Sequence, residues 1–306
     1  MENMKVLIIG CGHIAGFGNG ALRPNHAMAI KRSFNDAQVT CFDIDTERAV
    51  SFARHYGFYP IDNLTNLDLA EFDLVVCATP ADTRYDIMER LAREISEHTL
   101  VVLEKPIADG IVERDRLAGG TERFFVNFPR SFQTGIECLK QKDWPQPNKI
   151  IVHYYKDVVS IGIHAFQLLS EFFDGISIQD ITAFGSDYRV EMQRQGNVVP
   201  VYFLNSGNEA AEIFEIDIFF DHSRLRLSSF AEKVELFDAL ENDAGEKELV
   251  LTSRYDIENE GFDVLYEDLR QALNGKGISK RLASVKFDRT VEVHNTVIKH
   301  FNGPSK

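Results

Sequence analysis

The residues with the clearest chemical potential are Glu104, Lys105 and Pro106, which directly follow the apolar run Leu100–Leu103. Ligands of open α/β sheets lie beyond the carboxyl ends of the strands, so a lysine at this point faces a bound ligand. An amine beside a positively charged ligand loses basicity, which moves it toward useful acid–base chemistry. Glu104 could orient the lysine, and Pro106 fixes the backbone that presents it. The structural alternative is an exposed lysine that caps a strand.

A glycine-rich turn, "GCGHIAG", follows the first apolar run and has G-x-G-x-x-A spacing at Gly10, Gly12 and Ala15. The first glycine permits a tight turn, and the second lets the backbone approach a pyrophosphate. The small third residue permits close packing of a helix whose N-terminus favours the phosphate charge. The turn therefore predicts a dinucleotide site that includes His13 and Ile14; a plain βα turn is the alternative.

Asp43 stands at the end of the second predicted strand, where a carboxylate can accept hydrogen bonds from both ribose hydroxyls of an adenosine. It would repel a 2′-phosphate, and Asp45 adds to that repulsion, so the sequence favours NAD over NADP. The alternative is that Asp43 caps the helix that begins at Thr46. The interval from Gly10 to Asp43 is longer than usual. The segment "GFGNGALRPNH" therefore predicts a loop inserted before the helix resumes at His26, near the mouth of the site.

Strands and helices alternate through the first half of the chain. The apolar runs "KVLIIG", "AQVTCFDID", "DLVVCATP" and "TLVVLEKP" predict four strands. One helix is predicted from Thr46 to a stop near Gly57, and the segment "DTRYDIMERLAREIS" predicts another, with apolar residues at helical spacing. Near-continuous apolar strands separated by amphipathic helices predict a doubly wound α/β domain with a parallel sheet.

Several of these segments resemble the Gfo/Idh/MocA family of NAD(P)-dependent oxidoreductases. They are "GCGHIA", "CFDIDTERA", "VVCATP" and above all "VVLEKPIA". The resemblance continues in "VNFPRSF", in "IGIHAFQLLSEFFDG" and in "EIFEIDIFFDHSRLRLSS", and the order matches over essentially the whole chain.

The resemblance implies a dinucleotide-binding Rossmann domain over residues 1–120 and a substrate-binding and oligomerisation domain over residues 121–306. The second domain would be an α+β domain with a large open, mostly antiparallel sheet. The sequence agrees independently, since "NKIIVHYY", "DITAFGS", "VPVYFLN", "IFEIDIFF" and "RLRLSS" are closely spaced strand-like runs. The acidic segment Glu241–Glu248 predicts a surface turn.

The resemblance also implies roles for single residues. Lys105 matches a lysine that contacts the substrate hydroxyl, and His164 matches the active-site histidine usually proposed as the acid–base group. Thr79 and Pro80 match a strand end near the nicotinamide, and Glu104 is expected beside the nicotinamide ribose or the lysine. A histidine on an apolar helix face is otherwise more often a satisfied core residue.

The sequence departs from the family pattern around His164. Many members have an aspartate four residues earlier and another three residues later, where this chain has Ser160 and Gln167. Neither side chain takes up a proton at working pH, which puts turnover in question. Part of the family lacks the first acid and has a short lead-in that "YYKDVVSIGIH" partly resembles. Possible substrate contacts in and after this lead-in are Tyr154, Tyr155, Lys156, Asp157, Ser160 and Gln167; for the residues of the lead-in, exposed strand-end positions are the alternative.

Two arginines occupy other family positions. Arg84 stands where the family often has a histidine, and it could bind a substrate anion or face solvent. Arg130 matches an arginine that the family often has and is expected to be structural.

These observations predict an oxidoreductase that transfers hydride between NAD and a secondary alcohol or ketone of a sugar, nucleotide sugar or polyol. Two alternatives remain open. One is a catalytically weakened regulatory protein that binds NAD and a sugar, and the other is a glycoside hydrolase that uses NAD catalytically.

The composition is that of a globular protein. The 306 residues are 44% hydrophobic and 26% charged, and the net charge of −14 argues against a nucleic-acid surface. No apolar run reaches the length of a membrane helix, and no leader precedes the first strand, so a cytoplasmic protein is expected. The four cysteines contain no CxxC pair, which favours buried free thiols over disulfides or a metal site. A homodimer or larger homo-oligomer is expected from the open sheet of the family.

Overall fold

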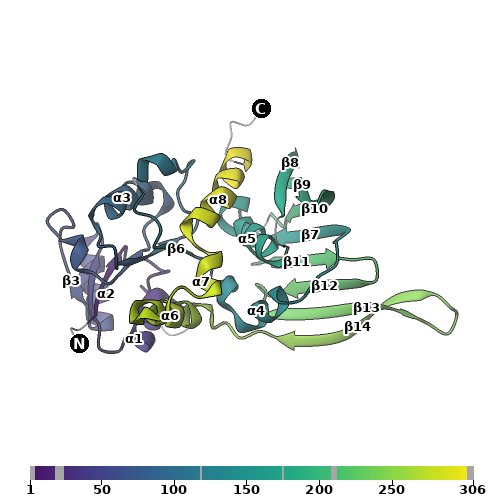
Figure 1. Cartoon of the computed structure of the whole chain (residues 1–306), viewed down its shortest axis with the longest axis horizontal. Helices are drawn as coiled ribbons and strands as arrows, with labels where there is room; N and C mark the ends of the chain where they lie inside the picture. Colours follow the sequence, from purple (N-terminus) through teal and green to yellow (C-terminus); the bar gives the residue numbers. More distant parts are fainter. Residues whose placement is uncertain (1–3, 18–23, 118, 174–175, 208–211, 302–306) are drawn as a thin grey trace. The chain divides into compact units, whose positions relative to one another are not determined.

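The computed structural model describes residues 4–17, 24–117, 119–173, 176–207 and 212–301 (Figure 1). They divide into two compact units. The first comprises Met1–Phe132 and Glu260–Asn295, and the second comprises Gln133–Asn259 and Thr296–Lys306. The first unit extends beyond the expected boundary at residue 120, because the next strand pairs with its sheet, and a later segment of the chain returns to it.

The first unit contains a six-stranded sheet with the order β3-β2-β1-β4-β5-β6. All five strand pairings are parallel. The chain runs outward from β1 to β3 and then outward from β4 to β6, so the topological switch point lies between β1 and β4. The predicted doubly wound Rossmann sheet is confirmed. The strands are β1 (Lys5–Ile9), β2 (Gln38–Phe42), β3 (Tyr59–Pro60), β4 (Leu74–Cys77), β5 (Leu100–Glu104) and β6 (Phe124–Asn127).

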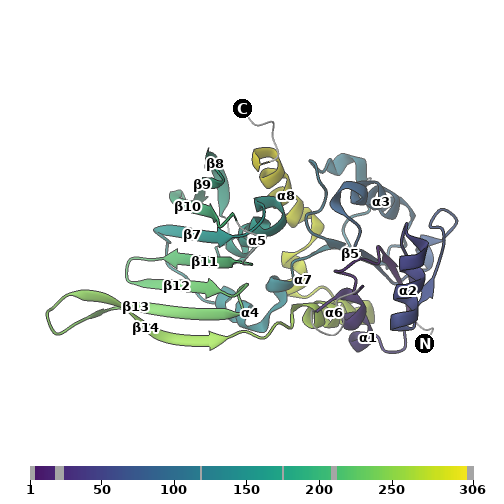
Figure 2. The ribbon, with the colours of Figure 1, turned by 180° about the vertical axis from the view of Figure 1, so that it is seen from behind.

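Helices cover both faces of this sheet (Figures 1 and 2). The chain moves toward one edge of the sheet from β1 to β3 and toward the other edge from β4 to β6. Because both sets of crossovers are right-handed, α1 and α2 lie on one face and α3 lies on the other. The returning segment adds α6, which packs on α1. Helix α8 begins in the first unit and ends in the second. The bounds are α1 (His26–Ser33), α2 (Thr46–Tyr56), α3 (Ala81–Glu94), α6 (Gly261–Gln271), α7 (Lys280–Ser284) and α8 (Phe287–Phe301).

The ends of α2 follow from its capping residues. Asp45 is the N-cap and accepts a hydrogen bond from the backbone N–H of Arg48 at 3.1 Å. Gly57 ends the helix in the left-handed conformation that glycine adopts without strain. The predicted start at Thr46 and stop at Gly57 are confirmed, but Asp45 rather than Asp43 is the cap.

The inserted loop interrupts a helix that the chain then resumes. A helical turn starts at Gly12, whose carbonyl accepts hydrogen bonds from the N–H groups of Gly16 and Phe17. After the insertion, His26 N–H donates to the carbonyl of Ile14, so α1 stacks directly on this turn. The helix resumes at His26 as predicted, while residues 18–23, expected near the mouth of the site, lie outside the described part of the chain.

The second unit contains an eight-stranded sheet with the order β14-β13-β12-β11-β7-β10-β9-β8. The pairing of β7 with β10 is parallel, and the other six pairings are antiparallel. The predicted large, mostly antiparallel sheet is confirmed. The strands are β7 (Lys149–Tyr154), β8 (Ser177–Phe184), β9 (Asp187–Arg194), β10 (Asn197–Asn205), β11 (Phe214–Phe219), β12 (Ser223–Ser228), β13 (Lys233–Glu241) and β14 (Lys247–Asp256).

Burial alternates along the central strands of this sheet. Ile216 and Ile218 of β11 are buried in the core. On the other face, Glu215 and Asp217 form ion pairs with arginines of β12. The helices of this unit are α4 (Thr134–Lys140) and the apolar α5 (Ile163–Phe172), which continues from a π-helical turn, η5 (Val158–Gly162).

The longest hairpin, β13–β14, reaches past the ends of the neighbouring strands (Figures 1 and 2). Its tip, between Glu241 and Lys247, is the surface turn predicted from the sequence. Strand β14 is the edge of the sheet and is exposed along most of its length.

Cysteine burial was predicted correctly for three residues and wrongly for one. All four cysteines are free thiols; Cys11, Cys41 and Cys77 are buried, whereas Cys138 is exposed. Within the described residues, no group of three or more His, Cys, Asp or Glu side chains could hold a metal ion. None of the described helices combines the length and apolar character that a membrane crossing requires.

Candidate functional site

The glycine-rich turn lies at the switch point of the first sheet. Gly10 has φ +92°, and a Cβ atom there would lie 2.9 Å from the backbone of Ala78 and Thr79. A Cβ on Gly12 would meet nothing within 4 Å, so its backbone borders open space. His13 and Ile14 are exposed beside it, while Ala15 is fully buried. This combination leaves room for a pyrophosphate at the turn, which fits the predicted dinucleotide.

Asp43 joins this turn to the end of β2. Its Oδ2 accepts a hydrogen bond from the backbone N–H of Cys11 at 2.8 Å, and its Oδ1 accepts one from that of Asp45 at 2.9 Å. The carboxylate is nearly buried. It thus sits beside the glycine-rich turn, where an adenosine ribose is expected.

Arg48 belongs to the same corner and was missed in the sequence analysis. Its guanidinium contacts Asp43 Oδ1 at 3.4 Å and Asp45 Oδ2 at 3.2 Å, with 41% of its side chain exposed. An arginine near the ribose carboxylate is the group that accommodates a 2′-phosphate. Its position in the first turn of α2, three residues after Asp45, is the sequence signal that could have identified it.

Glu104 ends β5 as a buried carboxylate, with 6% of the residue exposed. Its Oε1 accepts hydrogen bonds from His26 Nε2 at 2.9 Å and from Asn127 Nδ2 at 2.5 Å. Burial alone would raise the pKa of Glu104, but the hydrogen bonds from His26 and Asn127 and the charge of Lys105 hold that pKa below its usual value. Glu104 therefore stays ionised directly before Lys105, which is half-buried.

Arg84 takes a position that neither alternative in the sequence analysis anticipated. It is 3% exposed, so it does not face solvent. Its Nη1 donates to the carbonyls of Glu104 at 2.5 Å, of Pro106, and of Ile107 at 3.5 Å, and its Nη2 donates to that of Thr79. Burial lowers the pKa of Arg84. The guanidinium connects the ends of β4 and β5 and is directed at backbone rather than at a substrate anion.

The first unit therefore brings together most of the predicted cofactor residues at one edge of its sheet. Gly10 lies against Thr79, and β4 pairs with β5 up to Cys77 and Leu103, the residue before Glu104. Pro80, directly after Thr79, is the N-cap residue of α3. Arg130 is half-buried in a short 3-10 helix of the same unit, Pro129–Phe132.

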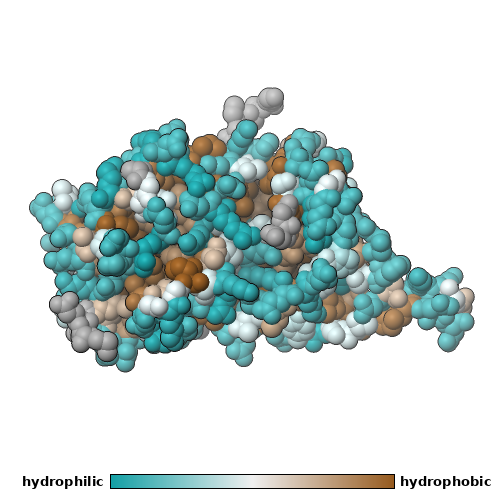
Figure 3. Space-filling model, viewed as in Figure 1, coloured by the Kyte–Doolittle hydropathy of each residue, from teal (hydrophilic) through white to brown (hydrophobic). Residues whose placement is uncertain are grey.

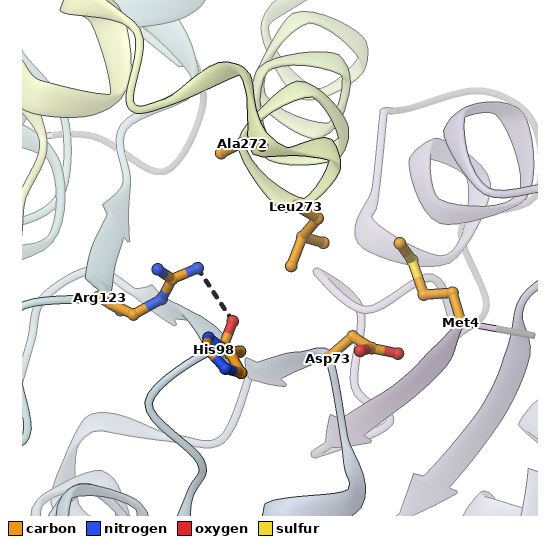
Figure 4. A pocket seen from close by; sticks show the side chains of 7 residues that line it. Met4, Asp73, His98, Arg123, Ala272 and Leu273 are labelled. Atoms are coloured by element: carbon orange, nitrogen blue, oxygen red, sulfur yellow. Dashed lines mark hydrogen bonds between the residues drawn. The ribbon is translucent and has the colours of Figure 1, made fainter. Parts of the chain in front are cut away.

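A cavity of about 370 Å³ lies at the opposite ends of these strands (Figure 4). Met4, Asp73, His98 and Arg123 line it, and each of them precedes a strand of the sheet. Arg123 donates to the His98 carbonyl at 2.9 Å. Because ligands of such sheets bind beyond the carboxyl ends, this cavity is separate from the candidate cofactor site.

In the second unit, His164 lies near the start of α5 and is almost fully buried. Its ring meets that of Phe214 edge-on at 6.2 Å. Gln167, one turn later, donates to Glu171 Oε1 at 2.7 Å, and Glu171 forms an ion pair with Lys140 at 2.6 Å. The acid nearest Gln167 on this helix is thus neutralised by a lysine.

The lead-in to α5 forms a compact turn. Asp157 caps the π-helical turn by accepting a hydrogen bond from the N–H of Ser160 at 2.7 Å. Lys156 is exposed, and Tyr155 is nearly buried with its ring edge-on to Phe230. Tyr154 is fully buried in the sheet, and burial raises the pKa of its hydroxyl. Tyr154 is therefore a core residue rather than a substrate contact.

Lys105 belongs to the first unit and His164 to the second, so each is described within its own surroundings. The first unit contains every residue predicted for the cofactor. The second contains the residues predicted for the substrate, apart from Arg84 and Lys105.

The fold and this site define a protein with a Rossmann dinucleotide-binding unit. Residues 4–119 match the model of the Gfo/Idh/MocA family, described as an oxidoreductase family with an NAD-binding Rossmann fold. Over residues 4–119, this match confirms the resemblance seen in the sequence motifs, and it supports the predicted class, an NAD(P)-dependent oxidoreductase.

Solved structures share the fold over the whole chain. A dehydrogenase (MviM) from Clostridium difficile is 13% identical with a TM-score of 0.71, covering 98% of this chain and 99% of the other. A UDP-N-acetylglucosamine 3-dehydrogenase from Acidithiobacillus ferrooxidans is 18% identical with a TM-score of 0.72, covering 98% and 96%. A 3-ketoreductase from Actinomadura kijaniata, with NADP and TDP-benzene, is 14% identical with a TM-score of 0.70, covering 97% and 96%. No curated protein matches the chain by sequence.

Replacing Arg84 with methionine is expected to lower the free energy of unfolding by about 2–3 kcal/mol, because buried carbonyls lose their donor. Urea denaturation at pH 7 measures this loss. Arg93→Met is the matched control, since Arg93 is exposed on the same helix and should change stability by less than about 0.5 kcal/mol. Equal losses in the two variants would contradict the structural role of Arg84.

Proposed function

We propose that this chain transfers hydride between NAD and a secondary alcohol or ketone of a sugar-like substrate, with Lys105 as a proton-handling group. The observation that carries the proposal is the ionised, buried Glu104 at the carboxyl end of β5, directly before Lys105. This arrangement keeps a charged acid and an amine together at the edge of the sheet where a ligand binds.

Oxidation of an alcohol releases a hydride and a proton, and the bound nicotinamide supplies the hydride acceptor. The amine of Lys105 takes the hydroxyl proton in the oxidation and returns it to the alkoxide in the reduction. Glu104 holds a negative charge beside this amine in both directions. His164 is proposed as the second acid–base group.

Nucleotide-linked sugars are the substrate class that we propose first. Two structures with the same fold are described as a UDP-N-acetylglucosamine 3-dehydrogenase and as a 3-ketoreductase with NADP and TDP-benzene. Free sugars and cyclic polyols are the other candidates. In the second unit, Tyr155, Lys156, Asp157, Ser160 and Gln167 are proposed substrate contacts, of which Lys156 and Asp157 are exposed.

NAD is the cofactor that we propose over NADP. Asp43 and Asp45 place two negative charges at the ribose corner, against the single positive charge of Arg48. Two carboxylates repel a 2′-phosphate more strongly than one half-exposed arginine attracts it.

Two other functions fit the fold. In a regulatory protein, the missing acids at Ser160 and Gln167 would leave NAD and sugar binding without turnover. In an NAD-using glycoside hydrolase, the sugar would be oxidised and reduced again, so turnover would occur without net formation of reduced nicotinamide.

A homodimer or larger assembly is also proposed, formed through the face of the eight-stranded sheet that carries the ion pairs. Arg224 lies 5.2 Å from the ring centroids of Phe219 and Phe237 on this face. Beside Phe237, β14 adds the exposed Leu251 and Leu249. Figure 3 shows hydrophobic atoms in brown at the base of the projecting end of this hairpin. A projecting two-stranded ribbon with exposed leucines is stabilised by contact with a second copy.

A cytoplasmic location remains part of the proposal. The four free cysteines support it, because free thiols persist in a reducing compartment.

Lys105→Met is expected to lower kcat by at least about 100-fold, because the variant keeps the length of the side chain but cannot take a proton. Reduced nicotinamide is followed with NAD⁺ and a panel of nucleotide-linked sugars, free sugars and polyols. Lys280→Met, at an exposed lysine of the same unit, is the control and should keep full activity. Undiminished turnover in Lys105→Met would refute the proposed role.

Asp43→Asn is expected to weaken NAD⁺ binding about tenfold or more, because a charged acceptor for the ribose is lost. The same change should narrow the preference over NADP⁺, since the repulsion of the 2′-phosphate falls. Arg48→Ala should weaken NADP⁺ binding and leave NAD⁺ nearly unchanged. Titration calorimetry gives the four affinities, and tighter binding of NADP⁺ than NAD⁺ by the unaltered protein would overturn the cofactor assignment.

Light scattering is expected to give at least twice the mass of one chain. Leu251→Asp should shift the protein toward monomer, because it adds charge to the proposed interface of a chain with net charge −14. Leu240→Asp is the matched control: Leu240 is similarly exposed, but it pairs with Glu248 and lies on the opposite face of the hairpin. Equal dissociation by both variants would argue against this face.

A further inference from the structure

We propose that His26 is a positioning residue that keeps Glu104 ionised beside Lys105, and that Tyr266 fixes the His26 tautomer that does so. The inference deepens the proposed function and rests on it for its catalytic consequence. The arrangement of the three side chains is a property of the first unit alone and can be tested without turnover.

The three side chains form a continuous hydrogen-bonded row in the interior of the first unit. Tyr266 Oη lies 2.6 Å from His26 Nδ1, and His26 Nε2 lies 2.9 Å from Glu104 Oε1. His26 and Tyr266 are fully buried, and Glu104 is nearly so. Tyr266 belongs to α6, His26 to α1 and Glu104 to β5. The row therefore connects the returning segment of the chain to the first helix and to the sheet.

Hydrogen-bond donors and acceptors in this row are consistent with one tautomer. An ionised carboxylate only accepts, so His26 Nε2 must carry a hydrogen. Burial and the charge of Glu104 raise the pKa of Tyr266 well above its ordinary value, so its hydroxyl keeps its proton. If Tyr266 donates to Nδ1, both nitrogens of a neutral His26 are satisfied. A doubly protonated ring would instead leave the buried hydroxyl proton without an acceptor in this row.

Glu104 has further partners on the other elements packed around it. Asn127 of β6 donates to the same oxygen, Oε1, as His26 does. Arg84 of α3 donates to the backbone carbonyl of Glu104, and its charge lies close enough to interact with the carboxylate. Lys105 contributes its charge from the next position in the chain. Of these groups, only His26 links the carboxylate to a buried hydroxyl.

The consequence concerns the protonation of Glu104. Without the hydrogen bond from His26, burial would dominate and raise the pKa of the carboxyl. A neutral Glu104 would no longer favour the charged form of Lys105, and the amine would lose its proton more readily. His26 would thus act on the reaction through Glu104, without contacting the substrate.

The first test measures the tautomer directly on the protein without cofactor. Long-range ¹⁵N–¹H NMR correlation of ¹⁵N-histidine-labelled protein distinguishes the two tautomers and the imidazolium, and the signals missing from His26→Gln assign His26. The expected result is the Nε2–H tautomer at pH 7. In Tyr266→Phe, the Nδ1 signal should shift because its donor is lost. Observation of the Nδ1–H tautomer or of the imidazolium in the unaltered protein would overturn the proposal.

The second test compares the pH dependence of stability in His26→Leu and His26→Gln, which both lack the imidazole. In His26→Leu, the folded pKa of Glu104 should rise above its unfolded value, so the charged carboxylate destabilises the protein at neutral pH. Lowering the pH from 7.5 to 5.5 relieves that cost, and the thermal midpoint should rise relative to that of His26→Gln. Glutamine keeps a donor toward Glu104 and an acceptor toward Tyr266. Identical pH profiles of the two variants would contradict the role.

The third test is kinetic. In the reduction direction Lys105 must carry the proton that it gives to the alkoxide. His26→Leu should therefore lower kcat about 10- to 100-fold and shift the alkaline limb of the pH profile downward by about one unit, whereas His26→Gln should stay within about threefold of the unaltered enzyme. Phe262→Leu is the packing control, because the Phe262 ring lies edge-on to His26 at 5.0 Å. A shifted alkaline limb in Phe262→Leu would assign the effect to packing. If the unaltered protein shows no turnover, the proposed function fails, while the tautomer and the stability profiles still decide the inference.

Discussion

The burial of one ionised carboxylate, that of Glu104, constrains most of the first unit. Moving a carboxylate out of water costs several kcal/mol unless hydrogen bonds and opposite charges compensate. Here α1 contributes His26, β6 contributes Asn127, and α6 contributes Tyr266 behind the histidine. These elements are widely separated in the sequence. The carboxylate therefore has all of these hydrogen-bond partners only when the sheet, the first helix and the returning segment have assembled. The inclusion of Glu260–Asn295 in the first unit follows naturally from this requirement.

The features that were predicted correctly from the sequence depend on residues that lie close together along the chain. Gly10 must be glycine because its φ is positive and the backbone of Thr79 lies against it, and both requirements belong to a motif of a few residues. The start of α2 at Thr46 and its end at Gly57 depend on capping residues next to them. The central strands β1, β4 and β5 of the first sheet are buried on both faces, and their continuous apolar runs are correspondingly clear. The turn at the tip of the long hairpin was also predicted correctly, because the acidic segment Glu241–Glu248 is a local signal for a surface turn.

What could not be predicted depends on partners far away in the sequence. The role of Arg84 depends on the pairing of β4 with β5, which brings the carbonyls of Thr79 and Glu104 to one guanidinium. Tyr266 lies more than two hundred positions from His26, and no local pattern marks it as a partner. Strand β14 was missed because it is exposed on both faces, which removes the alternation of polar and apolar residues that identifies a half-buried strand. The position of Arg48, by contrast, could have been found from the two acids that precede it.

The distribution of buried charge differs between the two units and bears on the proposed chemistry. Beside His164, two expected acids are replaced by Ser160 and Gln167, and the remaining buried acid of that helix, Glu171, is already neutralised by Lys140. In the first unit, Glu104 keeps its charge directly before Lys105. An amine next to an ionised carboxylate holds its proton more strongly than one among neutral groups, whereas a neighbouring cation has the opposite effect. In the proposed reaction, the basicity of Lys105 is therefore set by Glu104 and by the charge of the bound nicotinamide together. In that proposal, the absence of the acids around His164 would weaken a second proton-transfer group without removing the first.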